Sequence, residues 1–253
     1  MIAVVLCGGL GTRLDSEGIT KPKSLVKIDK ETIIDHLIKI FALYSVDEII
    51  LCTGYKHYMF EQYFKKKKNF DKLSRQRNLT TFSLIYLKKK IKIKLFFTGT
   101  NTGTGGRLKK ALKKFKLKDN FFFTYGDGLS DINLNNLKKY HLTSKKLATV
   151  TAVNPPSRYG KLDIKNKTVV SFNNEDRASK INGGFFVLSP KVIKFINKSS
   201  DYWEDLPMQN LIKKKQLNAY VYTGFWKSLD TLKDKKSFEN IIKRKKKAPW
   251  IKW

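Results

Sequence analysis

The residues best suited to chemistry lie close to the N-terminus. An apolar run, Met1–Leu6, leads directly into Cys7-Gly-Gly-Leu-Gly-Thr-Arg13, and Thr20-Lys-Pro-Lys23 follows shortly afterwards. An apolar run that ends in glycines predicts a buried strand followed by a tight loop. Glycines let backbone N–H groups approach a phosphate closely, and the arginine and lysines of the two motifs add positive charge. These residues therefore predict a polyphosphate-binding loop.

Two common phosphate-binding motifs do not fit this loop. A dinucleotide-binding fingerprint needs a glycine where Leu14 stands. A P-loop needs Gly-Lys followed by Ser or Thr, whereas Gly11 is followed by Thr12 and Arg13. The alternative interpretation is that the stretch binds no ligand and is a glycine turn after a strand, with basic residues scattered over the surface.

Two aspartates are candidate ligands of a magnesium ion. Asp127 lies in Tyr125-Gly-Asp-Gly128, directly after the predicted strand Asn120–Thr124. Open α/β sheets bind ligands at the carboxyl ends of their strands, and Mg²⁺ takes one or two carboxylates together with phosphate oxygens. Asp230 precedes a predicted helix at Thr231–Arg244 and is either the second metal carboxylate or the helix N-cap. A plain turn aspartate is the alternative for Asp127.

Two further glycine-rich stretches suit ligand binding. Thr98–Arg107 contains four glycines and four threonines and leads into a predicted helix, whose N-terminus we expect to offer free N–H donors. A flexible connector is the other interpretation of this loop. In Ile181-Asn-Gly-Gly184, Gly183 lets a sugar ring pack close to the backbone and Asn182 can hydrogen-bond its hydroxyls.

The order of the predicted elements indicates an α/β fold. Helical spacing over Thr32–Tyr44 is followed by the strand-like run Glu48–Cys52, and similar pairs recur, so we expect a mostly parallel sheet with helical crossovers. Thr80–Leu87 is expected on an edge or in a flap, and Trp203–Lys214 as a helix. No linker divides the chain, and we expect one domain over residues 1–253.

Composition narrows the class of protein further. The 253 residues carry a formal net charge of +31, mostly from lysines spread along the whole chain. Nucleic-acid binding is one interpretation of such a charge, but no nucleic-acid-binding motif accompanies it. The favoured interpretation is that the lysines cover solvated faces of the protein. The cysteines and histidines have no metal-ligand spacing. No segment approaches the ~18 apolar residues of a membrane span and no leader is recognisable, so we expect a cytoplasmic protein without membrane insertion.

The ordered motifs resemble those of sugar-1-phosphate nucleotidyltransferases. Two stretches, Asn101-Thr-Gly-Thr-Gly-Gly-Arg107 and Ile181-Asn-Gly-Gly-Phe-Phe186, together with the tail Lys247-Ala-Pro-Trp250, are similar to the glucose-1-phosphate cytidylyltransferases in particular. This resemblance implies a Rossmann-like α/β core with a small β-rich portion for the sugar and the C-terminus. It also implies Mg²⁺ dependence, a homo-oligomer, and a role in making CDP-deoxysugars for surface polysaccharide such as lipopolysaccharide O-antigen.

The resemblance also implies roles for individual residues. Residues 1–150 would mainly bind CTP and residues 151–253 mainly glucose 1-phosphate, with no specific nucleic acid as partner. Lys23, Arg13 and Asp127 would be catalytic, and Asp127 and Asp230 would hold Mg²⁺. The nucleotide would lie against a larger set: Leu6, Gly8, Gly9, Leu10, Gly11, Thr12, Arg13, Lys23, Thr102, Arg107 and Gly126. A transferase using UTP, dTTP or GTP is the alternative within this class.

The chain departs from the family pattern after Phe172. Related enzymes carry Glu-Lys-Pro there, whereas this chain has Asn173-Asn-Glu-Asp-Arg177. Lys180, Arg177 and Lys161 are the candidates to replace the lysine that would approach the sugar phosphate.

Overall fold

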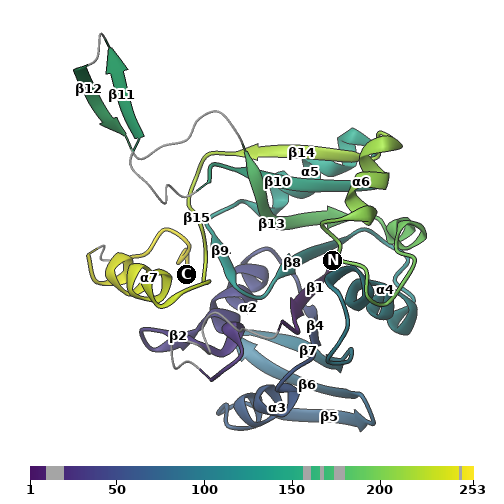
Figure 1. The fold of residues 1–253 in the computed structure, drawn as a ribbon. Helices are drawn as coiled ribbons and strands as arrows, with labels where there is room; N and C mark the ends of the chain where they lie inside the picture. The colour runs from purple at the N-terminus through teal and green to yellow at the C-terminus, as the bar shows by residue number, and fades with distance from the viewer. Residues whose placement is uncertain (10–19, 156–160, 166–167, 174–179, 245–246) are drawn as a thin grey trace.

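The computed structural model describes residues 1–9, 20–155, 161–165, 168–173, 180–244 and 247–253, with the backbone alone over 161–173. A nine-stranded sheet runs through the molecule in the order β14-β10-β13-β8-β1-β4-β7-β6-β5 (Figure 1). Its strands are β1 (Ile2–Cys7), β4 (Glu48–Thr53), β5 (Asp71–Gln76), β6 (Leu79–Tyr86), β7 (Lys89–Phe97), β8 (Phe121–Tyr125), β10 (Ala148–Val153), β13 (Ile181–Leu188) and β14 (Leu217–Tyr222). Pairing directions show that β6 and β13 run opposite to the others, which confirms the predicted mostly parallel sheet.

Helices and small hairpins complete the described fold. The helices are α2 (Ile33–Leu43), α3 (His57–Lys65), α4 (Thr104–Phe115), α5 (Leu134–Ser144), α6 (Leu206–Lys213) and α7 (Leu232–Arg244), with 3-10 turns η1 (Lys23–Leu25) and η2 (Pro190–Phe195). Two-stranded pairs form between β2 (Lys27–Ile28) and β3 (Glu31–Thr32), β9 (Gly128–Ser130) and β15 (Trp226–Ser228), and β11 (Lys161–Lys165) and β12 (Thr168–Asn173). None of the described helices is long and apolar enough to cross a membrane.

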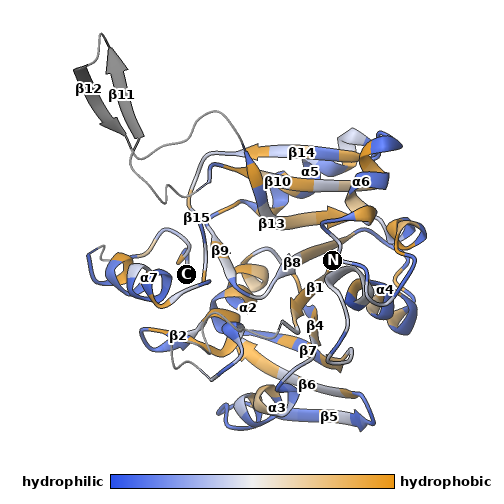
Figure 2. Cartoon of the chain, viewed as in Figure 1, coloured by the Kyte–Doolittle hydropathy of each residue, from blue (hydrophilic) through white to orange (hydrophobic). Residues whose placement is uncertain are grey.

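Strand β1 is buried on both faces, which explains its unbroken apolar sequence. Ala3 and Val5 belong to the hydrophobic cluster that includes α2, whereas Val4 and Leu6 belong to the cluster on the opposite face, with α4 and Trp203. Side chains alternate between the faces of a strand, so a central strand needs apolar residues at every position. Figure 2 shows the apolar residues concentrated in the central strands and the polar ones on the outer helical surfaces.

The structure differs from the sequence predictions at two elements. Strand β6 is not at the edge, because β5 pairs outside it. All six residues of β5 are exposed, so this strand has no apolar alternation by which to recognise it. The predicted helix from Trp203 begins only at Leu206, with Pro207 in its first turn, and the Trp203 side chain is fully buried ahead of it.

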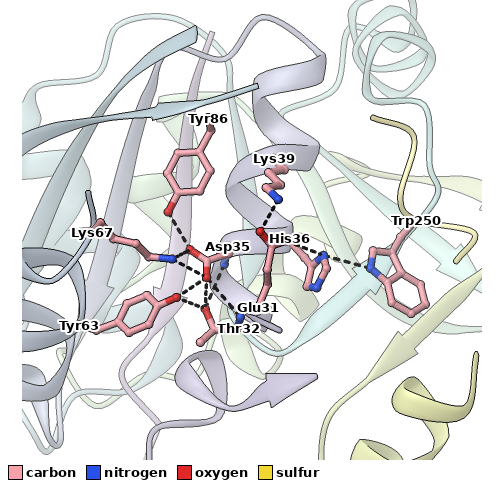
Figure 3. A network of polar contacts seen from close by, with 9 residues as sticks. All are labelled: Glu31, Thr32, Asp35, His36, Lys39, Tyr63, Lys67, Tyr86 and Trp250. Atoms are coloured by element: carbon pink, nitrogen blue, oxygen red, sulfur yellow. Dashed lines mark hydrogen bonds and ion pairs between the residues drawn. The ribbon is translucent and has the colours of Figure 1, made fainter. Parts of the chain in front are cut away.

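Trp250 fastens the C-terminal segment to the core. Its indole packs against Phe225 and Phe238 with ring centroids 5.1 and 5.4 Å apart. Its Nε1–H donates to Nδ1 of His36 over 3.4 Å (Figure 3). Burial lowers the pKa of His36 to about 4, so the imidazole is neutral at pH 7 and able to accept this hydrogen bond.

A fully buried carboxylate, that of Asp35, joins three elements on one side of the sheet (Figure 3). It forms the capping box of α2 with Thr32, and it also accepts hydrogen bonds from the hydroxyls of Tyr63 and Tyr86. The Lys67 ammonium lies 2.8 Å away and supplies the opposite charge. Burial by itself raises the pKa of Asp35, but Lys67 and the two phenols more than offset this and hold it below the usual 3.8.

Replacing this carboxylate should destabilise the protein in a pH-dependent way. Asp35→Asn should lower the free energy of unfolding by about 3 kcal/mol at pH 7, because one partner of a buried ion pair is removed. A carboxyl whose folded pKa is lowered stabilises the fold above its unfolded pKa and loses that contribution as the pH falls through the folded value. The difference between variant and wild type should therefore narrow below pH 3.8. Urea denaturation at several pH values measures it.

Asp71→Asn is a suitable control, because it removes a carboxylate from an exposed pair with Lys90. The denaturation midpoint of this variant should equal that of wild type. An equal loss of stability in both variants would contradict the role given to Asp35.

Candidate active site

Three charged residues from distant parts of the sequence meet beside the carboxyl end of β8. Lys23 begins η1, Asp127 follows β8, and Asp230 lies between β15 and α7. The Lys23 Nζ atom is 2.6 Å from Asp230 Oδ1 and 3.7 Å from Asp127 Oδ2. Their side chains are 22%, 31% and 24% exposed, so all three are partly open to solvent. The sequence predicted these residues as one site, and the structure brings them together.

Asp230 is not the cap of α7. Thr231 and Asp234 form a capping box instead: Thr231 Oγ1 accepts from Asp234 N–H (3.2 Å), and Asp234 Oδ2 accepts from Thr231 N–H (3.0 Å). The carboxylate of Asp230 instead accepts from Lys23 and from the Ser228 hydroxyl, 2.9 Å away. Of the two roles left open by the sequence, the structure therefore excludes the helix cap.

The two carboxylates have opposite pKa shifts. Burial raises the pKa of Asp127, the charge of Lys23 opposes this in part, and the charge of Asp230 adds a smaller increase. Burial also acts to raise the pKa of Asp230, but the close hydrogen bond and charge of Lys23 outweigh it, and the pKa is lowered. The site thus places two carboxyl groups against one fixed positive charge.

Gly126 brings β1, β8 and η1 into contact. Its N–H donates to the Leu6 carbonyl at 2.8 Å. A Cβ atom at Gly126 would lie 2.4 Å from Ser24 Oγ and 2.7 Å from Cys7 Sγ, so no larger residue fits. The side chain of Leu6 packs in the hydrophobic core. The glycine therefore determines how closely Lys23, next to Ser24, approaches the end of β8.

The glycines after β1 have different surroundings. A Cβ atom at Gly8 would lie 2.2 Å from Arg107 Cζ, whereas one at Gly9 would meet none of the described residues within 4 Å. Gly8 is thus required for packing against Arg107, and Gly9 is not packed against the described part of the chain. The predicted site residues Leu10, Gly11, Thr12 and Arg13 lie outside the described residues.

Arg107 is 3% exposed and binds the ends of three parallel strands. Its guanidinium donates to the carbonyl of Gly8 after β1 (2.8 Å) and to that of Thr53 at the end of β4 (2.9 Å). After β7 it also reaches Thr98 Oγ1 and the carbonyls of Gly99 and Thr100. Burial lowers the pKa of Arg107. The contact with cytidine predicted for it stays a prediction, and these bonds show a structural role that its motif did not indicate.

At the N-terminus of α4, two of the glycine N–H groups expected to be free are bonded to another segment of the chain. Gly103 N–H donates to the Ser199 carbonyl (2.9 Å) and Gly106 N–H to the Asp201 carbonyl (3.1 Å). A Cβ atom at Gly106 would lie 1.9 Å from the oxygen of Ser199. These glycines serve close packing of another segment rather than a phosphate. Thr102, in the same loop, donates from its hydroxyl to the Thr98 carbonyl over 2.9 Å.

The predicted sugar-binding residues lie on β13. Asn182 is half-buried, and its Oδ1 accepts from Gly184 N–H over 2.8 Å. Gly183 is buried and its carbonyl accepts from the Trp226 indole over 2.6 Å. Lys180 donates to Asn154, and of the three candidates for the sugar phosphate it is the one whose side chain the structure describes.

Sequence reasoning missed three polar residues near these positions: Ser228, Tyr125 and Glu204. Ser228 supports Asp230 as described above, while Tyr125 donates from its hydroxyl to Glu204. Glu204 lies in a stretch that was predicted as plain helix, so no local pattern marked it.

The donor set suits a hard divalent cation. Among the described residues there is no group of three or more His, Cys, Asp or Glu side chains that could hold a metal. Mg²⁺, however, usually takes only one or two protein carboxylates and completes its shell with water and phosphate oxygens. Asp127 and Asp230, which face the same ammonium, fit that pattern.

Comparison with known proteins identifies the class of this fold and site. The sequence model described as "Nucleotidyl transferase" matches residues 2–236, so the chain belongs to the nucleotidyl transferase family. A solved structure titled as a putative glucose-1-phosphate thymidylyltransferase from Bacillus anthracis has the same fold, with a TM-score of 0.69, 16% identity, and coverage of 95% of this chain and 94% of that one.

More similar relatives narrow the family to one branch. The glucose-1-phosphate cytidylyltransferase of Salmonella typhimurium is 38% identical over 263 aligned residues, which cover 100% of both chains. The probable glucose-1-phosphate cytidylyltransferase of Bacillus subtilis is 37% identical and covers 92% of this chain and 93% of its own. Within the nucleotidyl transferase family, the chain thus groups with the glucose-1-phosphate cytidylyltransferases.

Removing the guanidinium should loosen the ends of the three strands. Arg107→Met keeps much of the side-chain volume but leaves several buried carbonyls without a donor, at a cost of about 1–3 kcal/mol for an unpaired buried group. We expect the free energy of unfolding to fall by about 3 kcal/mol or more, measured by urea denaturation. Lys113→Met removes one charge from an exposed position on the same helix and should change the free energy of unfolding much less. Equal stabilities of wild type and Arg107→Met would contradict the structural role.

Proposed function

We propose that this protein transfers the cytidylyl group of CTP to α-D-glucose 1-phosphate, giving CDP-glucose and pyrophosphate. The observation that carries the proposal is the Lys23 ammonium between the carboxylates of Asp127 and Asp230, next to the glycine loop after β1. The similarity to cytidylyltransferases along the full length of the chain supports the choice of nucleotide and sugar.

The reaction needs positioning and charge stabilisation more than proton transfer. An oxygen of the sugar phosphate attacks the α-phosphorus of CTP in line, and pyrophosphate leaves. The nucleophile is already an anion, so no strong general base is required. The barrier comes from bringing two anions together and from the shift of charge towards the leaving group.

The proposed roles follow from the charges at the site. Lys23 offsets negative charge at the α-phosphate, and Arg13 offsets that of the departing pyrophosphate. Asp127 and Asp230 would hold Mg²⁺, which when bound supplies a Lewis acid that stabilises charge on phosphate oxygens. Ser228 keeps the carboxylate of Asp230 oriented through its hydrogen bond. The backbone at Gly9, where none of the described residues lies within 4 Å of a Cβ position, borders the nucleotide in this scheme.

Loss of either charge should abolish most turnover without unfolding the protein. Lys23→Ala and Asp127→Ala should each lower kcat at least 100-fold, by analogy with the loss of one electrostatic contact to a transition state. The measurement is pyrophosphate release from CTP and glucose 1-phosphate, with circular dichroism to verify folding. Lys27→Ala removes an exposed lysine four positions away and should retain kcat. Near-normal turnover in both site variants would refute the proposed mechanism.

The identity of the nucleotide is tested by comparing CTP, UTP, dTTP and GTP at equal concentration with glucose 1-phosphate. We expect kcat/KM with CTP to exceed the others at least 10-fold, because a site that hydrogen-bonds the base edge rejects bases that leave its polar groups unpaired. Omission of Mg²⁺ with added chelator should stop the reaction. If another nucleotide is preferred, the protein would still be a nucleotidyltransferase, but CTP would not be the substrate that donates the nucleotidyl group.

A further inference from the structure

A segment outside the predicted motifs brings a carboxylate to the sugar side of the site. Residues Ser199–Glu204 lie against the N-terminus of α4, where the fully buried indole of Trp203 anchors them. The backbone N–H of Trp203 donates to Thr104 Oγ1 over 2.8 Å. Glu204 is thereby held at a defined position even though its own side chain is exposed.

Each oxygen of this carboxylate accepts a hydrogen bond from a hydroxyl group. Thr104 Oγ1 donates to Glu204 Oε2 over 2.6 Å, and the phenol of Tyr125 donates to Glu204 Oε1. Tyr125 is the last residue of β8 and stands two positions before Asp127. Glu204 therefore determines where the Tyr125 phenol directs its proton.

The single proton of the Tyr125 phenol also determines how the side-chain amide of Asn182 is oriented. The phenol has one proton and gives it to Glu204, so towards Asn182 its oxygen can only accept. Asn182 Nδ2 lies 3.4 Å from that oxygen, and Asn182 Oδ1 accepts from Gly184 N–H over 2.8 Å. A reversed amide would bring two acceptors together at Tyr125 and two donors together at Gly184. One N–H of Asn182 thus goes to Tyr125, and the other has no partner among the described residues, so a ligand could accept from it.

We propose that Glu204, acting through Tyr125, is a positioning residue that makes Asn182 present an N–H donor to an oxygen of the sugar. The inference rests on the proposed function, because it takes the ligand beside Asn182 to be the hexose of the sugar phosphate. Without Glu204, the phenol proton is free to turn towards Asn182 Nδ2, and the hydrogen bond from Asn182 to Tyr125 is lost. The amide is then held by Gly184 alone, and its second N–H is directed less firmly towards the sugar.

The test separates the Michaelis constants of the two substrates. Glu204→Ala and Tyr125→Phe should each raise KM for glucose 1-phosphate about 10-fold, the effect of one hydrogen bond worth about 1.4 kcal/mol. KM for CTP should stay within about twofold of wild type. Glu204→Gln should restore KM for the sugar phosphate to within about threefold, because its amide oxygen still accepts from Tyr125.

Matched variants exclude a merely structural effect. Asp205→Ala removes the adjacent exposed carboxylate, which makes no cap hydrogen bond to α6, and should leave both KM values unchanged. Asn182→Ala should raise KM for glucose 1-phosphate by as much as Glu204→Ala, and the double variant should be no worse than Asn182→Ala alone.

The outcomes distinguish this inference from the proposed function. If wild type turns over CTP and glucose 1-phosphate but Glu204→Ala leaves KM for the sugar phosphate unchanged, or raises both KM values equally, the positioning role is refuted alone. Additive effects in the double variant, or no rescue by Glu204→Gln, would refute it as well. If wild type itself does not turn over these substrates, the proposed function fails, and this inference with it.

Discussion

The buried guanidinium of Arg107 is the interaction on which the arrangement of the site depends. In a parallel sheet the loops that leave the carboxyl ends of the strands make the binding site, yet nothing in the strand pairing holds those loops together. The planar guanidinium has donors in several directions, so one side chain can satisfy carbonyls from three loops at once. Gly8 and Gly54 leave room for it: a Cβ atom on either would lie 2.2 to 2.5 Å from its atoms.

The charges of the site are arranged by contacts that are not themselves part of the chemistry. Asp230 can face Lys23 because Thr231 and Asp234 satisfy the first turn of α7. Lys23 is close enough because Gly126 has no side chain to separate β8 from the start of η1. The same ammonium then lowers the pKa of Asp230, while partial burial raises the pKa of Asp127, which lies farther from it.

In the proposed mechanism, adjacent residues at the end of β8 link the two substrates. Tyr125 orients the amide that would recognise the sugar, and Asp127 would hold the metal at the phosphates. Gly126 between them donates a hydrogen bond to Leu6 of β1, the strand whose following loop would border the nucleotide. Because these residues are consecutive, a shift of the strand end would disturb both binding steps together. The hydrogen bonds of Glu204 with Thr104 and Tyr125 join this strand end to the start of α4, the helix that also carries Arg107.

Much of the fold was predictable, because buried strands and amphipathic helices leave periodic patterns. Met1–Leu6 and Glu48–Cys52 were recognisable as strands, and Thr32–Tyr44 as a helix, from the spacing of their apolar residues. The exposed edge strand Asp71–Gln76 was not, since exposure removes the selection for alternation. Asp127 and Lys23 were recognisable because glycines and a preceding strand marked them.

The sequence alone determined the type of fold, the family resemblance and the set of charged residues available for chemistry, since these depend on composition and local order. Tertiary structure decided which residues face one another. It decided that Asp230 is free of the helix cap, that the glycines of Thr98–Arg107 pack against Ser199 and Asp201, and that Glu204 reaches Tyr125. These contacts join residues about 80 to 200 positions apart, and no local pattern carries information about a partner that only folding brings near.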